Sequence, residues 1–395
     1  MIRLLTLSVL VALAVPARGD VTFLGKLKIP GNSRDLSGLK GKLRDGSPID
    51  LLGGFGSGIA WTGQGNRYLA ISDRGPGDGV VACPCRFHTF EISVTPGKQP
   101  VVKAELKATA LLQDRQGHPY VGLLSALRSG KDGTRLDSEA IRVGPKGTVF
   151  IADEYGPHVL EFDIQGKLLR SLSVPRRFQV EKPHADPLLE LRNNRVGRQP
   201  NRGFEGLAIS PDGSKLLAML QNPLIQDGGQ ASDLLRILEI NVQTGATREF
   251  AYRLEKKELG VCEILAVNDS EFLVLERDHL AGSEARIKHL YKIDLRDASD
   301  VSGVSSFREQ TSIRTVKKTL FLNLLERKFG LAGRDFPAKI EGICFGPELP
   351  DGRLLLLVSS DNDFLQSQPS WIFAFAIDKK DLPGYRPQVF ERKKD

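Results

Sequence analysis

The sequence predicts an all-β fold, a single β-propeller that would most simply have six blades. Three observations predict it: a hairpin-like unit recurs five times, a third strand follows several of the units, and one further apolar strand stands near each end of the chain. Units repeating at roughly 60 to 80 residues, each built on a hairpin, are typical of propeller blades with variable outer strands. A pair of β-sandwiches whose turns coincide by chance is the alternative.

Each unit reads as a polar residue, a strand, a tight turn, a second strand and a polar end. The two clearest copies are 137–154 and 204–222, where Pro-Lys-Gly and Pro-Asp-Gly turns fall at the same place. Weaker copies occupy 57–74, 263–278 and 341–363. Short apolar runs bounded by such turns indicate strand, turn and strand.

The ends of the chain supply the closure of the ring. Third strands are expected at 159–163, 235–240 and 290–294, whereas the strands 21–27 and 371–377 have no partners within the five units. We expect these two strands to pair in one blade, which completes a six-bladed ring and leaves no free sheet edge.

Two segments depart from the repeat. The segment 175–202 is rich in Arg and Lys and poor in strand signals, and 320–331 has the apolar spacing of a short amphipathic helix. Both precede a Glu-Gly step, so both should cross the face of the propeller where those steps begin.

The N-terminus predicts export. Arg3 precedes an apolar run, 4–15, and small residues follow, so residues 1–19 read as a signal peptide before a propeller domain over 20–395. A run of about a dozen residues is too short to span a bilayer, although a retained anchor helix is the alternative. The protein is therefore expected in the periplasm or outside the cell, with no integral membrane segment once the leader is removed.

Composition excludes several classes of protein. The formal charge of +7 is a mild excess over a large surface and favours no nucleic-acid partner, which would call for a dense basic stripe. A bridge between Cys83 and Cys85 would be strained because only one residue separates them. Cys262 and Cys344 lie inside apolar runs and are expected to be buried free thiols.

A glutamate recurs just before the first strand of several units, and a second polar set ends the second strand. Because adjacent strands run antiparallel, both sets should meet at one end of the channel. Several carboxylates around one axis suit a hard divalent cation, Ca²⁺ before others. The candidate metal ligands are Glu139, Glu205, Glu341, Asp73 and Asp361.

An alternative remains open for the recurring glutamates. Each of Glu139, Glu205 and Glu341 could instead cap backbone N–H groups of its own blade. For Glu263 this capping role is favoured, because the glycine that follows the other three is missing.

Three residues are candidates for catalysis. Asp153 would orient or deprotonate a water, while Arg74 and Arg202 would hold an anionic group. No Gly-x-Ser-x-Gly step occurs, so a serine nucleophile has no support. His158 is read as a surface-loop residue rather than a base.

Several of these motifs resemble a known family. They are similar to the phytase-like domain, "esterase-like activity of phytase", of exported bacterial proteins, and they occupy 72–75, 137–141, 151–155, 201–208 and 339–343. The resemblance runs from about Leu52 to about Phe364. It implies a propeller fold and hydrolysis of phosphoesters or carboxylesters. The chain departs from the pattern at Ser57, which takes the glutamate position of the first unit.

Two functions follow as expectations. The first is a divalent-metal-dependent hydrolase acting on a small anionic ester at the central channel. The second, of another class, is a non-catalytic propeller scaffold that binds a protein or small-molecule ligand across one face.

Overall fold

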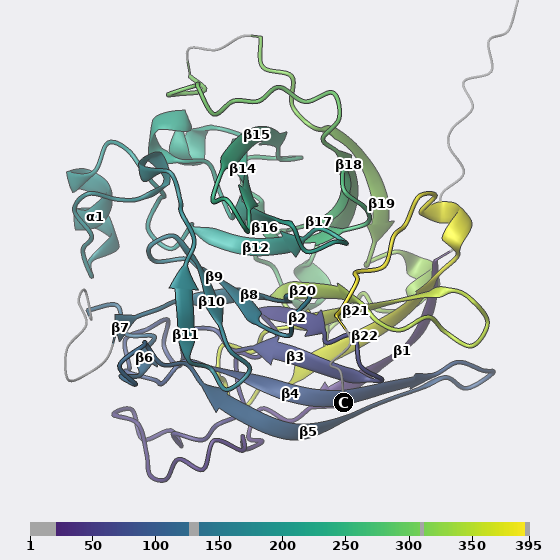
Figure 1. Ribbon diagram of the computed structural model, residues 1–395. Helices are drawn as coiled ribbons and strands as arrows, with labels where there is room; N and C mark the ends of the chain where they lie inside the picture. Colours follow the sequence, from purple (N-terminus) through teal and green to yellow (C-terminus); the bar gives the residue numbers. More distant parts are fainter. Residues whose placement is uncertain (1–20, 126–133, 309–311, 392–395) are drawn as a thin grey trace, which may run out of the picture.

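The protein is a five-bladed β-propeller, seen in a computed structural model that describes residues 21–125, 134–308 and 312–391 (Figure 1). Each blade is a four-stranded antiparallel sheet, and one small parallel pair, β6 (Tyr120–Val121) with β7 (Thr134–Arg135), lies outside the blades. The expected signal peptide, residues 1–19, lies outside the described residues. No helix among the described residues is long and apolar enough to cross a membrane.

The first three blades follow one another along the chain. Blade 1 contains β2 (Gly58–Trp61), β3 (Arg67–Ile71), β4 (Arg86–Thr95) and β5 (Val101–Leu111). Blade 2 contains β8 (Ser138–Val143), β9 (Val149–Asp153), β10 (His158–Phe162) and β11 (Leu168–Ser171). Blade 3 contains β12 (Phe204–Ile209), β13 (Lys215–Leu220), β14 (Leu234–Asn241) and β15 (Thr247–Arg253).

The last two blades complete the ring. Blade 4 contains β16 (Gly260–Ala266), β17 (Glu271–Arg277), β18 (Lys288–Asp294) and β19 (Lys317–Asn323). Blade 5 contains β20 (Ile340–Phe345), β21 (Leu354–Ser360), β22 (Ser370–Ile377) and β1 (Val21–Ile29). The described helical elements are α1 (Pro187–Asn193) and six 3₁₀ turns: η1 (Arg176–Phe178), η2 (Ile225–Asp227), η3 (Gly229–Ala231), η4 (Gly282–Glu284), η5 (Arg327–Phe329) and η6 (Lys379–Asp381).

The prediction of six blades is wrong, and its physical reason lies in the terminal strands. β22 is the third strand of the fifth hairpin unit rather than the start of another blade, and β1 adds the fourth strand beside it. The five hairpins therefore give five blades, since each unit already accounts for its own inner strands.

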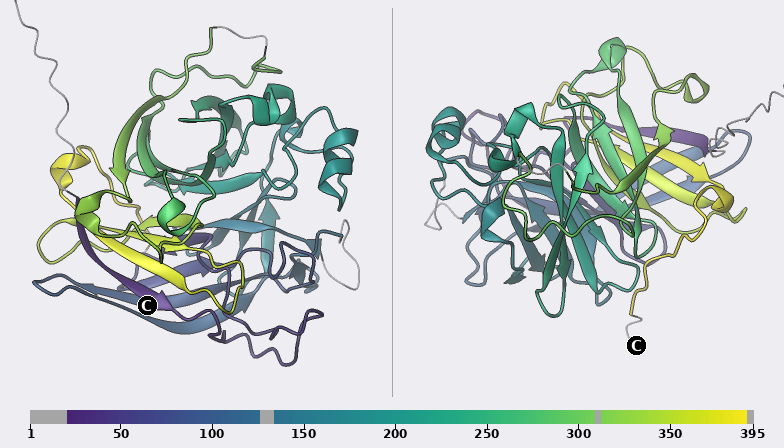
Figure 2. Two further views of the ribbon diagram at one scale, coloured as in Figure 1. Left: turned by 180° about the vertical axis from the view of Figure 1, so that it is seen from behind. Right: turned by 90° about the horizontal axis from the view of Figure 1, so that it is seen from above.

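The predicted closure by the chain ends is confirmed. β1 pairs antiparallel with β22, with Val21 opposite Ile377 and Ile29 opposite Ser370. Figure 2 shows the two segments, purple and yellow, side by side in both views. The ring is thus held by a pairing between the two ends of the described chain.

The innermost strands line the channel in the order β2, β8, β12, β16 and β20, and each contacts the next. Apolar side chains fill the space between blades. One cluster joins blades 2, 3 and 4 through Phe150, Leu207 and Ile264, and another joins blades 4 and 5 through Leu273 and Ile343. This buried apolar packing makes the ring a rigid frame for the residues at its two ends.

The amphipathic helix expected at 320–331 is not present. Residues 317–323 form the outer strand β19, and η5 follows. The alternating exposure of an outer strand places Leu322 in the core and leaves Leu320 exposed, and this alternation over a few residues was mistaken for helical spacing.

The first strands of blades 2 to 5 share a β-bulge near the end where they start. In blade 2, Ser138 opposes Asp153 and Ala140 opposes Ala152, so Glu139 has no partner across the ladder. The bulge falls at Glu205 in blade 3, at Glu341 and Gly342 in blade 5, and at Cys262 in blade 4. A bulge re-aims the side chain of the extra residue, so this device turns particular side chains toward the channel opening.

A buried ion pair blocks the channel close to the end that the C-terminal residues cover, where Arg142 lines a pocket together with Tyr385 and Gln388. The Arg142 guanidinium lies 2.9 Å from a Glu263 oxygen, and both side chains are almost fully buried. Arg142 also donates to carbonyl oxygens of three other blades, those of Ile59, Ile264 and Ile343, at 3.0, 3.0 and 3.4 Å. Glu263 accepts from the backbone N–H of Leu207 in blade 3 at 2.9 Å. One pair of side chains therefore ties all five blades together.

The C-terminal tail, residues 383–391, closes the end of the channel where the first strands finish. Its polar contacts reach blades 2, 3 and 4: Arg386 N to Val267 O at 2.9 Å, Gln388 Nε2 to Val143 O at 2.6 Å, Val389 N to Pro211 O at 2.7 Å and Glu391 N to Pro145 O at 2.8 Å. Its rings reach the other two blades, Tyr385 against Phe345 and Phe390 against Trp61. The channel is therefore a cup, closed at this floor and open only at the opposite mouth.

Candidate functional site

Two sets of five register-equivalent residues surround the mouth of the cup. The first set stands at the start of the innermost strands: Ser57, Glu139, Glu205, Cys262 and Glu341. The second set stands at the end of the second strands: Asp73, Glu154, Gln221, Arg277 and Asp361. The antiparallel register therefore brings both sets to one face, although in blade 4 Cys262 occupies the position expected for Glu263.

A cavity of about 170 Å³ occupies the mouth. We call it the mouth cavity; its lining residues are Asp73, Arg74, Asp78, Glu139, Glu154, Asn201, Arg202, Glu205, Gln221, Arg277, His279, Lys339 and Glu341. Six of these side chains are acids and four are Arg or Lys. The sequence-predicted residues Asp73, Arg74, Glu139, Arg202, Glu205 and Glu341 are all among them.

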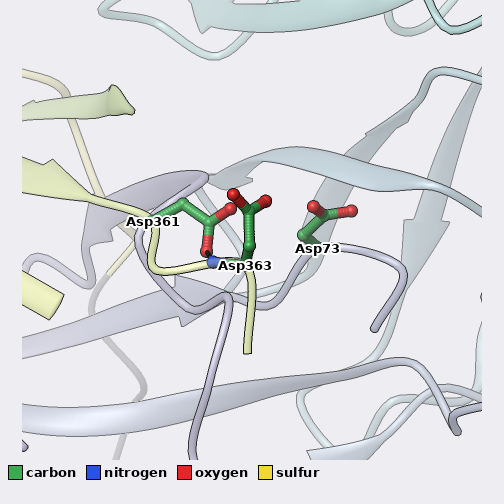
Figure 3. A group of neighbouring side chains, drawn as sticks. All are labelled: Asp73, Asp361 and Asp363. Carbon is green, nitrogen blue, oxygen red and sulfur yellow. Dashed lines mark hydrogen bonds between the residues drawn. The ribbon is translucent and has the colours of Figure 1, made fainter. Parts of the chain in front are cut away.

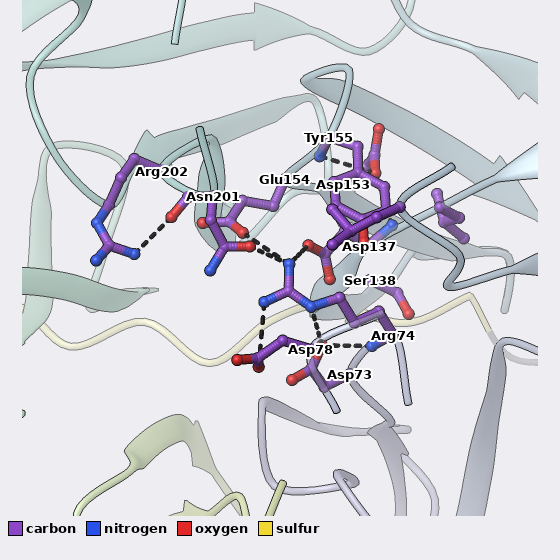
Figure 4. A network of polar contacts seen from close by, with 12 residues as sticks. Asp73, Arg74, Asp78, Asp137, Ser138, Asp153, Glu154, Tyr155, Asn201 and Arg202 are labelled. Carbon is purple, nitrogen blue, oxygen red and sulfur yellow. Dashed lines mark hydrogen bonds and ion pairs between the residues drawn. The ribbon is translucent and has the colours of Figure 1, made fainter. Parts of the chain in front are cut away.

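Arg74 is the hub of a polar network on one side of the mouth cavity (Figure 4). Its Nη1 lies 2.5 Å from Asp137 Oδ2 and donates to Asn201 Oδ1, and Glu154 lies 3.8 Å away. Asn201 adopts a left-handed conformation with φ of 54°. Since Arg74 is almost fully buried and its Nη groups already have these partners, it is positioned to orient neighbouring acids.

Charged pairs also fill the opposite side of the mouth. Arg277 Nη2 lies 2.7 Å from Glu341 Oε1, so this arginine pairs with an acid of the neighbouring blade. Ser57 Oγ lies 3.4 Å from the other Glu341 oxygen. Glu341 is thus the one recurring glutamate of the mouth cavity that has a cationic partner of its own among the described residues.

Asp73, Asp361 and Asp363 form a cluster (Figure 3), and Lys339 pairs with all three. Its Nζ lies 3.3 Å from Asp361 and 3.7 Å from Asp73, and it also pairs with Asp363. Although burial acts to raise the pKa of Asp73, Arg74 and Lys339 hold it below its usual value. Burial raises the pKa of Asp361 well above its usual range despite Lys339. These aspartates could hold a cation only by displacing the ammonium.

Glu139 and Glu205 differ from their neighbours. In the described part of the chain their carboxylates make no hydrogen bond and no ion pair, so neither caps backbone N–H groups. Burial, followed by repulsion from Asp73 and Glu205, raises the pKa of Glu139 well above its usual range. Burial, followed by repulsion from Glu154 and Glu341, does the same to the pKa of Glu205. Two buried acids without partners are an energetic cost that a bound cation would remove.

The donor chemistry around Glu139 fits a hard cation. Oxygens of Asp73, Asp137 and Glu139 lie within 4.8 Å of one another. Carboxylate oxygens clustered at this spacing are the ligands that Ca²⁺ and Mg²⁺ take in proteins. Glu205 faces the same mouth cavity from the next blade, so residues of blades 1, 2 and 3 could share one ion.

Asp153 lies beside the mouth cavity but does not line it. Its oxygens accept from backbone N–H groups of Asp137 and Gly156 at 2.9 and 2.8 Å, and His158 Nδ1 lies 2.7 Å away. Burial opposes ionisation, yet these bonds, led by that of His158, hold the pKa of Asp153 below its usual value. Its neighbour Glu154 holds the position in blade 2 that lines the mouth cavity.

Glu154 has the features expected of a proton acceptor. Its Oε1 is buried without a hydrogen-bond partner among the described residues, and burial raises its pKa although Arg74 and Arg202 oppose the shift. No role was predicted for Glu154 from the sequence, because Asp153 was the candidate there. The signal that distinguishes it from Asp153 is register, because only one of two successive strand residues faces the channel.

Arg202 is the mouth arginine without an acidic ion-pair partner among the described residues. Within the described chain its guanidinium makes one hydrogen bond, from Nη1 to the carbonyl oxygen of Asn201 at 2.6 Å. Arg74 and Arg277 by contrast pair with acids. Arg202 is therefore the guanidinium with most capacity left for an external anion.

Two structural features of the site were missed from the sequence. The pairing of Lys339 with three aspartates joins residues of blades 1 and 5, and the pairing of Arg142 with Glu263 joins blades 2 and 4. A charged residue within the apolar run of β8 was the available signal for Arg142. The four cysteines are buried and free, as expected for Cys262 and Cys344.

Comparisons with known proteins give one family and one relative. Residues 50–364 match the family model "Phytase-like: Esterase-like activity of phytase". An uncharacterized secreted protein of Arthroderma benhamiae is 29% identical over an alignment of 315 residues, with 60% of this chain covered. The chain spans about three fifths of the length of that relative, 61%.

Solved structures overlap only loosely. Regucalcin of Agrobacterium tumefaciens, a calcium-binding protein, superposes with a TM-score of 0.39 at 10% identity, covering 94% of this chain and 98% of that one. The β-propeller domain of Myceliophteria thermophila Cps50 (Swd1) superposes with a TM-score of 0.35 at 12% identity, covering 82% of this chain and 97% of that one. A Xanthomonas campestris gluconolactonase superposes with a TM-score of 0.34 at 12% identity, covering 81% of this chain and 85% of that one. Overlaps this loose carry no information on activity.

Proposed function

Because the chain belongs to the family described as "Phytase-like: Esterase-like activity of phytase", we propose that it is an exported hydrolase of anionic phosphoesters or carboxylesters that depends on a divalent cation. The observation that carries the proposal is the pair of buried, unpartnered acids Glu139 and Glu205 in the mouth cavity. The secreted relative is consistent with export.

The cation would be held by Glu139 and Glu205, with Asp73 and Glu341 beside them. Asp361 would contribute only where Lys339 moves aside, because the ammonium now lies 3.3 Å from it. Ca²⁺ is the first choice, since all the available ligands are oxygens. When bound, such a cation supplies Lewis acidity toward an ester oxygen and an attacking water.

The remaining residues position the substrate and move a proton. Arg202 would bind the anionic group of the ester, because its guanidinium has no acidic ion-pair partner within the described chain. Glu154 Oε1 would accept a proton from the attacking water, since a raised carboxyl pKa brings a base closer to neutral pH. Asp153, first predicted in that role, would instead hold the Glu154 turn through its backbone hydrogen bonds. Arg74 would orient Glu154 and Asn201.

The alternative is a non-catalytic scaffold that binds a ligand across the mouth. The observation that favours it is Lys339, whose ammonium already satisfies three aspartates without a metal. Under this alternative the acids of the mouth need no cation and no turnover follows.

Hydrolysis assays decide between the two. Metal-free protein would be tested on p-nitrophenyl phosphate, phytate and short acyl esters, with Ca²⁺, Mg²⁺, Mn²⁺ or Zn²⁺ added back. We expect cation-dependent turnover that falls at least about a hundredfold in Glu154→Gln, with the exposed Glu284→Gln as a matched control. Absence of turnover with every cation, or turnover unchanged in Glu154→Gln, contradicts the proposal.

A further inference from the structure

A second pocket of about 190 Å³ adjoins the mouth cavity and shares Arg74, Asp78 and Asn201 with it. We call it the Arg135 pocket; its other lining residues are Leu124, Arg135, Tyr155, His184, Ala185, Pro187, Glu190, Arg198 and Pro200. Because Arg74 and Asn201 form a common wall, one ligand could occupy both spaces.

Arg135 is held in this pocket by contacts with a backbone carbonyl and an aromatic ring. Its Nη1 donates to the carbonyl oxygen of Leu124 at 2.9 Å, and its guanidinium carbon lies 4.1 Å from the centre of the Tyr155 ring. Among the described residues no acid forms an ion pair with it. Burial, together with repulsion from Arg198, lowers the pKa of Arg135.

Tyr155 contributes a second unsatisfied group. The side chain is almost fully buried, and its hydroxyl has no hydrogen-bond partner among the described residues. Two guanidinium groups lie near this ring, since the carbon of Arg74 is 5.7 Å and that of Arg135 is 4.1 Å from the ring centre. A buried donor without a partner is rare in folded proteins, so a ligand that reached the Tyr155 hydroxyl would satisfy it.

The other wall combines an internal ion pair with small apolar side chains. The ion pair of Glu190 with Arg198 anchors α1, and both Arg198 Nε and Nη2 donate to the Tyr155 carbonyl oxygen, at 2.9 and 2.7 Å. Ala185 and Pro187 line this wall. The pocket is therefore preformed around Arg135.

From this geometry we infer that the Arg135 pocket binds a second anionic group of the same ligand, a phosphate or carboxylate carried on an organic molecule. The inference rests on the proposed function, because the first anionic group is the one assigned to Arg202 in the mouth cavity. It narrows the substrate class to esters whose alcohol portion carries a negative charge of its own. Esters with a neutral alcohol portion would bind without using Arg135.

The test is direct binding without turnover. Calorimetric titrations in the presence of chelator would compare pyrophosphate, fructose 1,6-bisphosphate and phytate, which differ in span, with inorganic phosphate and fructose 6-phosphate. We expect at least one multiply charged probe to bind the unmodified protein about tenfold more tightly than its singly substituted counterpart. Arg135→Gln should abolish this difference, and Arg202→Gln should weaken every probe.

Two further variants guard against a folding artefact. Ala185→Phe fills the pocket without removing a charge and should also abolish the difference. Arg176→Gln alters an exposed arginine of segment 175–202 that does not line the pocket, and it should leave the affinity for every probe unchanged. If every probe binds Arg135→Gln and the unmodified protein equally well, or if no multiply charged probe has an advantage, the inference is wrong. A surviving advantage in a protein without hydrolytic activity would contradict the proposed hydrolase and leave the pocket standing.

Discussion

The floor and the mouth of the cup are built from the same repeat but balance their charges in opposite ways. Near the floor, Glu263 has a guanidinium partner at 2.9 Å and a backbone N–H donor at 2.9 Å. At the mouth, Glu205 comes from the equivalent hairpin of the preceding blade. Within the described chain it has no guanidinium partner and no backbone N–H donor. The sequence aligned these two glutamates, whereas the structure separates them by one position of register.

The difference of one residue has a simple cause. Glu205 is itself the bulge residue of its strand, whereas in blade 4 the bulge residue is Cys262 and Glu263 follows it. Successive strand residues point to opposite sides, so a shift of one turns a side chain from the mouth to the interior. A repeated motif therefore predicts the fold of a hairpin but not the direction in which its glutamate side chain points.

The largest expected effect on stability comes from the pairing of β1 with β22, which closes the ring and so supports both the floor and the mouth. Deleting residues 371–395 removes most of β22, which lies between β21 and β1, so blade 5 would lose its central pairing. We expect no cooperative unfolding transition by circular dichroism. Truncation after Leu382 is the matched control, because it spares every strand and removes only the floor tail; it should fold with a lowered midpoint. Two proteins of equal stability would contradict this description of the ring.

The next effect tests the floor. Arg142→Met leaves the buried Glu263 carboxylate without its cation, and breaking a buried pair costs about 3 to 5 kcal/mol. Urea denaturation should therefore show a large loss in the free energy of unfolding. Replacing both partners, as in Arg142→Met with Glu263→Met, should recover much of it, and binding at the mouth should be unaffected. A loss below about 1 kcal/mol would show that the pair does not stabilise the ring.

The smallest expected effect is a gain in stability, and it tests the mouth. A raised carboxyl pKa means that the folded protein retains a proton that the unfolded chain releases. The contribution of Glu205 is thus favourable below its unfolded pKa, about 4.3, and is lost as pH rises through the higher folded value. In chelator, Glu205→Gln should be more stable than the unmodified protein near pH 8, by on the order of 1 kcal/mol.

The same difference should vanish near pH 4, where both proteins carry a neutral group. Thermal or urea unfolding at several pH values measures it. A Glu205→Gln variant that is less stable at pH 8 without metal would show that the carboxylate has a partner in the folded protein, and the contrast with Glu263 would disappear.

Local pattern was sufficient for much of the fold. The five hairpins, their third strands and the pairing of the chain ends all follow from turns, apolar runs and unpartnered strands. The blade number was wrong because nothing local tells whether residues 371–377 open a blade or complete one; only the pairing of β22 with β21 decides that.

The types of residue at the site could be predicted from the sequence. Which of the side chains face the mouth cavity could be predicted less well. Glu139, Glu205, Glu341 and Asp73 meet in one cavity, as the antiparallel register implied. Which of Asp153 and Glu154 faces the cavity depends on the register of β9, and the sequence places both acids together at the end of that strand. Ion pairs between blades depend on which blades are neighbours across the axis, and this was not known from sequence.

The central claim is that the mouth, and not the floor, is a cation site. Calorimetric titration of Ca²⁺ into metal-free protein tests it most directly, with Mg²⁺, Mn²⁺ and Zn²⁺ as further cations. We predict binding to the unmodified protein, a loss of at least about tenfold in affinity for Glu205→Gln, and full retention in the Arg142→Met, Glu263→Met double variant. No heat with any of the four cations, or binding that survives Glu205→Gln unchanged, would contradict the account.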